Sequence, residues 1–271
     1  MNSVAGLFLA GQINGTTGYE EAAAQGITAG INAALEIQDK EPCIFGRDEG
    51  YIGVLSDDLT TLGVIEPYRM FTSRAEYRLH LREDNADSRL TPTARKLGLV
   101  NDAAWRVFED RQNRMNKEIA RFAATRVKPV EKDNSWLESL SSAHIKDAIS
   151  LADLIRRPEL NYSMLSERFH CDTALSSNEE RRVEVELKFA GYLKRQLDDI
   201  ERMKRMEDAV IPQSFSYEAI RGLGIEAKER LGKVRPGTLG QASRVSGITP
   251  ADISLLAVHL KRASASATLS S

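Results

Sequence analysis

The sequence lacks the features that would place it in a membrane, around a metal ion or in a redox pair. No apolar run is long enough to span a bilayer, although 42% of the 271 residues are hydrophobic. The two cysteines, Cys43 and Cys171, do not form a CxxC pair, and the four histidines are scattered without metal-ligand spacing. We therefore expect no metal site, no membrane contact and a reducing, cytoplasmic compartment.

The chain also has little net charge, which is −2 at pH 7, so its global charge indicates no class of partner. The charge is nevertheless unevenly distributed. Residues 1–60 hold two basic and nine acidic side chains, whereas residues 61–130 hold fourteen basic and nine acidic ones. This reversal of sign suggests that the two segments face different partners.

The usual phosphate-binding motifs, GxGxxG and GxxxxGK[ST], are absent, but a glycine-rich turn runs from Gly11 to Gly18. It follows the short buried-strand pattern Leu7–Ala10 and precedes an alanine-rich helix predicted for Tyr19–Leu35. Free N–H groups and a positive dipole end at such a helix start suit a phosphate or an electron-rich ring edge. The alternative is a tight strand-to-helix turn with no ligand. Gly26 and Gly30 lower the helix propensity, which suggests close packing against a sheet or cofactor domain.

The remaining pattern is mostly helical, and no strand is expected after residue 90. The fold class is therefore mostly α, with a small α/β beginning. Residues 130–146 are polar and predicted to be loop-rich. A short helix is expected from Thr91 to Gly98, and a long one from Ala103 to Pro129 with Asp102 as its N-cap. Further helices are expected at Leu151–Arg156, from near Asn161, and at Asn178–Met206, which is the strongest pattern. Several short helices are expected in the last sixty residues.

An arginine-rich segment surrounds Tyr77. Alternation of apolar and basic residues from Tyr77 to Arg82 predicts a half-buried strand. A capping box of Ser73 and Glu76 would instead start a helix that carries Arg74, Arg78 and Arg82. Either structure puts Arg78 and Arg82 on one face, where arginines can neutralise phosphates. The alternative is a lattice of structural ion pairs with neighbouring carboxylates, namely Glu66, Glu76, Glu83, Asp84 and Asp87.

Two further segments have competing interpretations. Lys194 and Arg195 lie on the long predicted helix, whose charged face is either solvated or in contact with nucleic acid. The Gly191-Tyr192 pair inside that helix would permit close approach of another backbone. In the tail, glycine turns before short helices could present N–H groups to a nucleic-acid backbone. The alternative is compact helix packing around Leu255, Leu256 and Val258.

Two long sequence blocks resemble the GidA/MnmG family of tRNA-uridine-modifying flavoproteins. The first runs from Ala10 to Gly26 and the second from Glu66 to Asp87. Weaker blocks in the same order are Arg156–Glu159, Gly191–Gln196 and Gly240–Ile248. We therefore expect the chain to be a carboxyl-terminal fragment of such a protein.

The resemblance implies an enzyme that binds FAD, uses NADH and, with an MnmE-type GTPase partner, modifies carbon 5 of the wobble uridine of tRNA. It also implies a homodimer, and it assigns the carboxyl-terminal tail to binding of the GTPase partner. Neither cysteine lies in a matching motif, so no catalytic residue is carried over. The cofactor-binding candidates are Gln12, Asn14, Gly15, Thr16, Thr17 and Gly18. The tRNA-binding candidates are Arg69, Arg74, Arg78, Arg82, Lys194 and Arg195.

We expect three domains: a remnant of the FAD-binding domain at 1–42, a helical tRNA-binding domain at 43–212, and a partner-binding unit at 213–271. The fragment alone is expected to hold no FAD, because the GxGxxG unit is absent, and to be inactive. The rival hypothesis is a free-standing helical nucleic-acid-binding module without flavin chemistry. The Gln12–Gly26 block discriminates the two, since such a module has no use for a flavin-domain ending.

Overall fold

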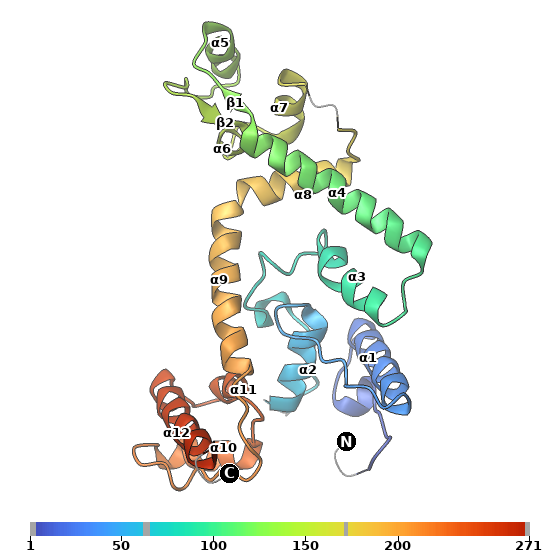
Figure 1. Cartoon of the computed structure of the whole chain (residues 1–271), viewed down its shortest axis with the longest axis vertical. Coiled ribbons are helices and arrows are strands. Elements are labelled where there is room, and N and C mark those ends of the chain that lie inside the picture. The colour runs from blue at the N-terminus through green and yellow to red at the C-terminus, as the bar shows by residue number, and fades with distance from the viewer. Residues whose placement is uncertain (1–3, 62–65, 171–172, 269–271) are drawn as a thin grey trace. The chain divides into compact units, whose positions relative to one another are not determined.

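The computed structural model describes residues 4–61, 66–170 and 173–268, with side chains described as far as residue 261. Within them the chain is mostly helical, as the sequence predicted (Figure 1). It forms two compact units. The first unit holds the residues up to Arg78 and those from Leu197 onward, and the second unit holds Leu79–Gln196. The domain boundaries at 42/43 and 212/213 stay a prediction.

The first unit begins with a turn and two helices. The 3₁₀ helix η1 (Gly11–Asn14) precedes α1 (Tyr19–Ile37), which has Glu20 and Glu21 in its first turn, where carboxylates favour the helix dipole. The helix α2 (Tyr51–Thr61) and the 3₁₀ helix η2 (Thr72–Arg74) follow. The predicted α1 is thereby confirmed, with an end two residues later.

The buried strand predicted for Leu7–Ala10 is wrong. These residues are not in a strand, and Leu7 and Phe8 are 40% and 38% exposed. A strand needs a hydrogen-bonded neighbour, and no described residue pairs with this segment. The close packing expected at Gly26 and Gly30 is also not found, because nothing in the described chain lies within 4 Å of an added Cβ at either position.

The rest of the first unit is a tail bundle, which we define as the segment from Ala209 through α10 (Ile225–Val234), α11 (Leu239–Arg244) and α12 (Pro250–Thr268). Of the three residues predicted to form the tail core, Leu256 is fully buried and Leu255 packs on the core, as expected. Val258 is 47% exposed, so the prediction is wrong for this residue. Its buried core consists of Ile211, Tyr217, Ile220, Leu223, Ala227, Leu231, Leu239, Ala242, Val245, Ile253 and Leu256.

The second unit packs short elements around one long helix, α4 (Asp102–Ala124). The antiparallel pair β1 (Arg126–Val127) and β2 (Ile149–Ser150) aligns Arg126 with Ser150 and Val127 with Ile149. The other helices are α3 (Ala86–Lys96), α5 (Glu131–Ser139), α6 (Leu151–Leu154), α7 (Tyr162–Arg168) and α8 (Ser177–Lys188). Phe122, Leu137, Leu154 and Leu165 are among the side chains that fill the core.

Several predicted boundaries in the second unit are wrong. Asn101, not Asp102, caps α4, because its side chain accepts a hydrogen bond from the N–H of Ala104. The helix expected from Thr91 begins at Ala86 and includes Pro92. The short pair β1–β2 follows residue 90, and the helix α5 lies in the predicted loop 130–146. In both places tertiary packing overrides a weak local pattern.

The long helix predicted for Asn178–Met206 is broken at Phe189. The residue leaves helical geometry, so α8 ends at Lys188 and α9 (Ala190–Glu207) begins beside it. The N–H groups of Tyr192 and Leu193 both donate to the carbonyl of Phe189, at 2.9 Å each. Gly191 directly after the break weakens helix propensity there. Residues 190–196 of α9 belong to the second unit and 197–207 to the first.

Candidate functional site: the glycine turn and the arginine block

The glycine turn (Gly11–Gly18) is held in shape by one side chain of α1. Gln25 accepts hydrogen bonds from the N–H of Gly11 at 3.1 Å and from Asn14 Nδ2 at 2.6 Å. Its own amide donates to Thr16 Oγ1 at 3.0 Å, and that hydroxyl donates to the Gly11 carbonyl at 3.1 Å. Gly11 and Gly15 have φ angles of +85° and +81°, which suit glycine. The turn is therefore closed by its own polar groups.

This closure divides the six cofactor-binding candidates into three kinds. Asn14 is half-buried and Thr16 is 2% exposed, and both side chains are engaged inside the turn. Gln12 and Thr17 are exposed. Gly15 and Gly18 have no side chain to offer. Of the side chains in this set, only those of Gln12 and Thr17 therefore face outward.

The glycine turn and the arginine block (Glu66–Asp87) meet through a short parallel bridge between Thr16 and Tyr68. The N–H of Tyr68 donates to the Gly15 carbonyl at 2.7 Å, and the N–H of Thr17 donates to the Tyr68 carbonyl at 3.3 Å. Two segments that are far apart in the sequence thus form one structure. The sequence pattern did not predict this contact.

Glu21 strengthens the same junction from the first turn of α1. It is 3% exposed, and its carboxylate accepts a 2.7 Å hydrogen bond from the N–H of Met70. This bond is the main reason why the pKa of Glu21 is lowered; burial opposes it, and the charge of Arg69 assists. A Cβ at Gly18 would clash with the Glu21 carboxylate. The glycine therefore leaves room for the buried acid.

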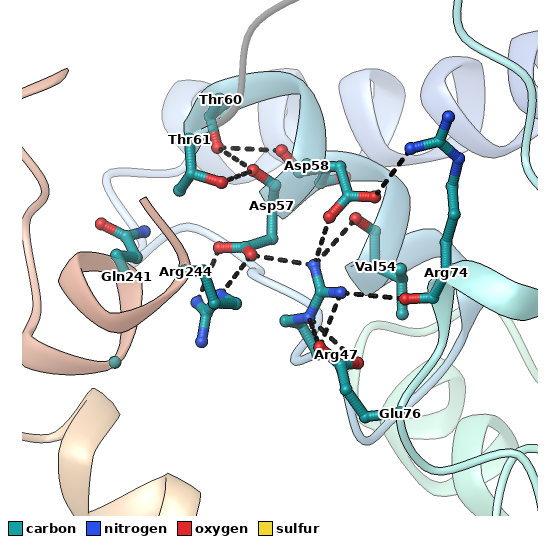
Figure 2. Close-up of polar contacts among 12 residues, drawn as sticks. Arg47, Val54, Asp57, Asp58, Thr60, Thr61, Arg74, Glu76, Gln241 and Arg244 are labelled. Carbon is teal, nitrogen blue, oxygen red and sulfur yellow. Dashed lines mark hydrogen bonds and ion pairs between the residues drawn. The ribbon is translucent and has the colours of Figure 1, made fainter. Parts of the chain in front are cut away.

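Arg47 lies at the centre of a second polar cluster, shown in Figure 2. Its guanidinium contacts Asp57 at 2.9 Å, Asp58 at 2.6 Å and Glu76 at 2.9 Å. It also donates to the backbone carbonyl of Arg74 at 3.2 Å. Burial alone would lower the pKa of Arg47. The hydrogen bonds and charge interactions with these carboxylates outweigh the effect of burial, so the pKa is raised. Arg47 thus ties the loop before α2 to the arginine block.

Tyr68 links the two clusters. Its hydroxyl donates to Asp58 Oδ2 at 2.7 Å, and the guanidinium carbon of Arg74 lies 4.3 Å from its ring centroid. Burial, followed by the interaction with Asp58, raises the pKa of Tyr68, so this hydroxyl stays a donor at neutral pH. The backbone of Tyr68 holds the glycine turn while its side chain holds the acidic end of α2.

Neither conformation predicted for the arginine block is correct. Residues 72–74 form a 3₁₀ turn, residues 78–80 form a turn, and no strand or α-helix covers 73–82. The reason is that Tyr68, Arg47 and Glu76 tie this backbone to α2 and to the glycine turn, not to a neighbouring strand. The regular elements that would have put Arg78 and Arg82 on one face are therefore absent from this described segment.

The four arginines of the block lie in different environments. Arg69 is 52% exposed and Arg74 37% exposed, and Arg78 is exposed. Arg82 is only 15% exposed and forms ion pairs with Asp84 at 2.9 Å and Glu186 at 2.8 Å. Burial alone would lower the pKa of Arg82, but the interactions with these two carboxylates outweigh that effect and raise the pKa. Arg82 has the contacts of a structural ion pair.

The remaining two tRNA-binding candidates lie on the first turns of α9. Lys194 and Arg195 are both exposed. The Arg195 guanidinium is 6.0 Å from the ring centroid of Tyr192, which is itself 60% exposed. Nothing in the described chain lies within 4 Å of an added Cβ at Gly191, so the close approach we expected there is not made within this chain.

Sequence reasoning missed Gln25, Arg47, Asp57 and Asp58. A signal existed for Arg47, because it is one of only two basic residues in the acidic first sixty. Gln25 gave no such signal. Cys43 is half-buried, and burial raises the pKa of its thiol. Cys171 lies outside the described residues.

The described residues hold neither a candidate metal cluster nor a membrane-spanning helix. No group of three or more His, Cys, Asp or Glu side chains there is arranged to hold a metal ion. No helix in the same ranges is both long and apolar enough to cross a membrane.

Three protein-family descriptions match the chain in order. Residues 1–41 match "Glucose inhibited division protein A", residues 102–197 match "tRNA modifying enzyme MnmG/GidA C-terminal helical domain", and residues 199–270 match "tRNA modifying enzyme MnmG/GidA C-terminal helical bundle". The second range begins with α4 and ends within α9, and the third runs from α9 through α12.

Curated relatives give the same result. The chain is 49% identical to the "tRNA uridine 5-carboxymethylaminomethyl modification enzyme MnmG" of Listeria welshimeri and to that of Listeria monocytogenes, over 96% of this chain and 41% of each relative. The Geobacter metallireducens protein of the same name is 48% identical over 95% of the chain and 41% of the relative. The chain thus spans about two-fifths of the length of these relatives.

Solved structures agree with the sequence relatives. Aquifex aeolicus GidA in its form II crystal superposes with a TM-score of 0.80 at 42% identity, covering 96% of this chain and 41% of that one. The form I crystal gives a TM-score of 0.77 at 42% identity, covering 95% and 39%. From these family, sequence and structural matches, the chain belongs to the GidA/MnmG family and contains its carboxyl-terminal helical domains.

Proposed function

We propose that this chain supplies the tRNA-binding and partner-binding part, and the flavin-facing turn, of an enzyme that modifies carbon 5 of the wobble uridine of tRNA. The added group is carboxymethylaminomethyl or aminomethyl. The names of the relatives support this reaction class, since they are tRNA uridine 5-carboxymethylaminomethyl modification enzymes. The chain alone is expected to be inactive, because it spans two-fifths of their length.

The observation that carries the proposal is the bridge between Thr16 and Tyr68. On one side of it, the glycine turn exposes Gln12 and Thr17. On the other side, the arginine block exposes Arg69 and continues to Arg74 and Arg78. A cofactor-facing turn and a cationic RNA-facing segment are thereby built as one piece. This arrangement suits an enzyme that must hold a base of the RNA next to a flavin.

The turn fits part of a flavin site. The exposed side chains of Gln12 and Thr17 would bind the cofactor, and the first N–H groups of α1 have no acceptor within the helix, as at every helix start. Asn14 and Thr16 would act indirectly, by keeping the turn closed. When bound, FAD would supply electron transfer, with NADH as the reductant. Because the GxGxxG unit that holds an FAD pyrophosphate is absent, we expect this chain alone to be colourless after excess FAD and desalting.

Phosphate contacts are assigned by exposure. Arg69, Arg74 and Arg78 in the first unit are proposed to bind tRNA, as are Lys194 and Arg195 in the second. The sequence makes Arg82 a tRNA-binding candidate as well. Its ion pairs with Asp84 and Glu186 instead support a structural role for this side chain. Arg69 and Arg74 also lie near carboxylates, Glu21 at 3.6 Å and Asp58 at 3.9 Å, but these contacts are longer than those of Arg82 and leave the two side chains more exposed.

The test is a titration of the chain with wobble-uridine tRNA, with and without an MnmE-type GTPase partner. The proposal expects tRNA binding by the chain alone and an additional complex when the partner is present. The rival function is a free-standing helical nucleic-acid-binding module. That rival would bind unstructured RNA of the same length as tightly as tRNA and would ignore the partner. Failure to bind any RNA would reject both.

The tail bundle is proposed to bind the GTPase partner. Its core begins at Ile211, and the N–H of Leu239 donates to the Ala209 carbonyl at 2.9 Å, so a clean deletion starts at Ala209. Removal of residues 209–271 should abolish partner binding measured by calorimetry while tRNA binding persists. Undiminished binding would reject the assignment. A homodimer and a cytoplasmic location complete the proposal.

A further inference from the structure

The tail bundle has a core of its own. Every residue of its buried cluster lies between Ile211 and Leu256, and the partly buried side chains packed on that cluster lie between Met206 and Leu260. None of them comes from α2 or the glycine turn. The bundle therefore does not depend on α2 for its hydrophobic stabilisation. Its attachment to α2 must be explained by other contacts.

Those contacts are ionic and centre on Arg244, the last residue of α11. Its guanidinium forms a two-bond pair with Asp57 of α2, with Nε at 2.6 Å from Oδ2 and Nη2 at 2.8 Å from Oδ1. Its third nitrogen, Nη1, donates to Glu207 at the end of α9. Arg244 and Asp57 are 14% and 11% exposed, so the pair is largely withdrawn from water. The ion pair of Lys204 with Asp48 at 3.2 Å joins α9 to the loop before α2, so it does not attach the bundle to α2, and its lysine is 52% exposed.

Asp57 is shared between the tail bundle and the arginine block. The same Oδ2 that pairs with Arg244 also accepts from Arg47 at 2.9 Å (Figure 2). Arg47 in turn holds Asp58 and Glu76 and the carbonyl of Arg74. Loss of Arg244 would leave a nearly buried carboxylate with Arg47 as its remaining charged partner. Two arginines from different parts of the first unit thus share one aspartate.

We propose that Arg244 and Asp57 form a charge latch that holds the tail bundle on α2 and thereby fixes Arg47 against the arginine block. The Gly240–Ile248 block, which we first assigned to the partner-binding tail, contains Arg244 and contributes this internal contact. A two-bond arginine–carboxylate pair is geometrically specific, so lysine at this position is a poor replacement. The latch does not depend on the proposed function, because it is a property of the first unit alone.

The experiment is hydrogen exchange on the full chain, followed by mass spectrometry of peptides from α2, α10 and α11. Arg244→Gln keeps a polar side chain but shortens it and removes its charge and two-bond geometry. It should raise exchange at least about tenfold in residues 51–61, since tenfold corresponds to about 1.4 kcal/mol, slightly less than a charge-assisted hydrogen bond contributes. Exchange in α10 should be unchanged, because the bundle keeps its core. Asp57→Asn breaks the same latch from outside the bundle and should raise exchange in residues 239–244.

The matched control is Arg230→Gln. Arg230 belongs to the same bundle and pairs with Glu226 at 2.7 Å and with the Ser246 carbonyl, but it forms no hydrogen bond or ion pair with α2 among the described residues. It should leave residues 51–61 protected. The latch is overturned if Arg244→Gln leaves exchange of 51–61 at the wild-type rate. If Arg244→Gln unfolds the bundle, the test rests on the Asp57→Asn variant. Exchange at the wild-type rate in residues 239–244 of that variant would overturn the latch.

Discussion

The backbone N–H of Tyr68 donates a 2.7 Å hydrogen bond to the carbonyl oxygen of Gly15. This bond places the start of the arginine block beside the glycine turn, although the helices α1 and α2 separate them in the sequence. The hydroxyl of the same tyrosine reaches Asp58, and through it the cluster around Arg47. One residue therefore connects the turn that we propose for flavin with the segment that we propose for tRNA.

The first prediction concerns Gln25, which closes the glycine turn. Gln25→Ala removes an acceptor from the Gly11 N–H and from Asn14 and a donor from Thr16. Leaving such buried groups unpaired should cost about 1–3 kcal/mol. Chemical denaturation of the chain measures the loss. Gln38→Ala is the control, since Gln38 is exposed just after α1 and should change stability by less than about 0.5 kcal/mol. Equal effects of the two substitutions would contradict the role given to Gln25.

The second prediction compares two helical glycines whose substitution should have opposite signs. Alanine in an exposed helix interior is about 0.5–1 kcal/mol more favourable than glycine. Gly26→Ala should give this gain, because nothing lies within 4 Å of the added methyl. Gly53→Ala in α2 should instead destabilise the chain, because its Cβ would overlap the backbone carbonyl of Gly46. Denaturation midpoints test the contrast, and a gain from both substitutions would refute the tight packing at Gly53.

The third prediction is a pH dependence from Glu21. Its pKa is lowered in the folded chain, chiefly by the Met70 N–H bond, so the carboxylate stabilises the fold above its ordinary value of 4.5. That contribution is lost as the pH falls through the lower folded value. Glu21→Gln should therefore be less stable than wild type at pH 7, and the gap should close on acidification below about pH 4.5. Glu20→Gln removes an exposed carboxylate from the same turn as a control. A gap that stays constant with pH would exclude the assignment.

How far the sequence could predict the site depends on how far apart in the sequence the contacting residues lie. The helix α1 and its acidic first turn follow from local pattern, as do the start of α7 after Asn161 and the presence of helices in the tail, although α12 is longer than the short helices expected there. The conformation around Tyr77 does not, because Arg47 and Tyr68 determine it through partners distant in the sequence. Alternation of apolar and basic residues there imitates a strand. Neither Gln25 nor Asp57 stands out locally, since each is defined by what it binds.

The fourth prediction tests the outward-facing side chain of the glycine turn. In a full-length protein of this family, Gln12→Ala should weaken FAD binding by up to about tenfold, the effect of losing one hydrogen bond to a ligand. Asn14→Ala should act differently, because Asn14 is engaged with Gln25 and Leu9. It should lower stability as well as affinity, whereas Gln12→Ala should leave the thermal midpoint unchanged. Flavin fluorescence during titration gives the affinity. Equal FAD affinities of Gln12→Ala and wild type would remove Gln12 from the site.

The last prediction separates phosphate-binding arginines from structural ones. Each true phosphate contact releases counterions, so its removal should weaken binding to any tRNA about equally and flatten the salt dependence by about one unit. Arg78→Ala and Lys194→Ala should behave in this way, because both side chains are exposed. Their thermal midpoints should stay at the wild-type value. Affinity measured across a salt series, beside thermal unfolding, gives both quantities for each variant.

Arg82→Ala is the matched contrast, since it removes the same side chain from the same block. Arg82 is paired with Asp84 and Glu186, and its loss leaves two carboxylates without their arginine. The substitution should therefore lower the thermal midpoint while the salt slope stays at the wild-type value. Glu186→Gln, which removes one partner, should lower the midpoint in the same direction without affecting the slope. If Arg78→Ala keeps the wild-type slope and Arg82→Ala flattens it, the assignment by exposure is wrong, and the paired arginine is the one that meets the RNA.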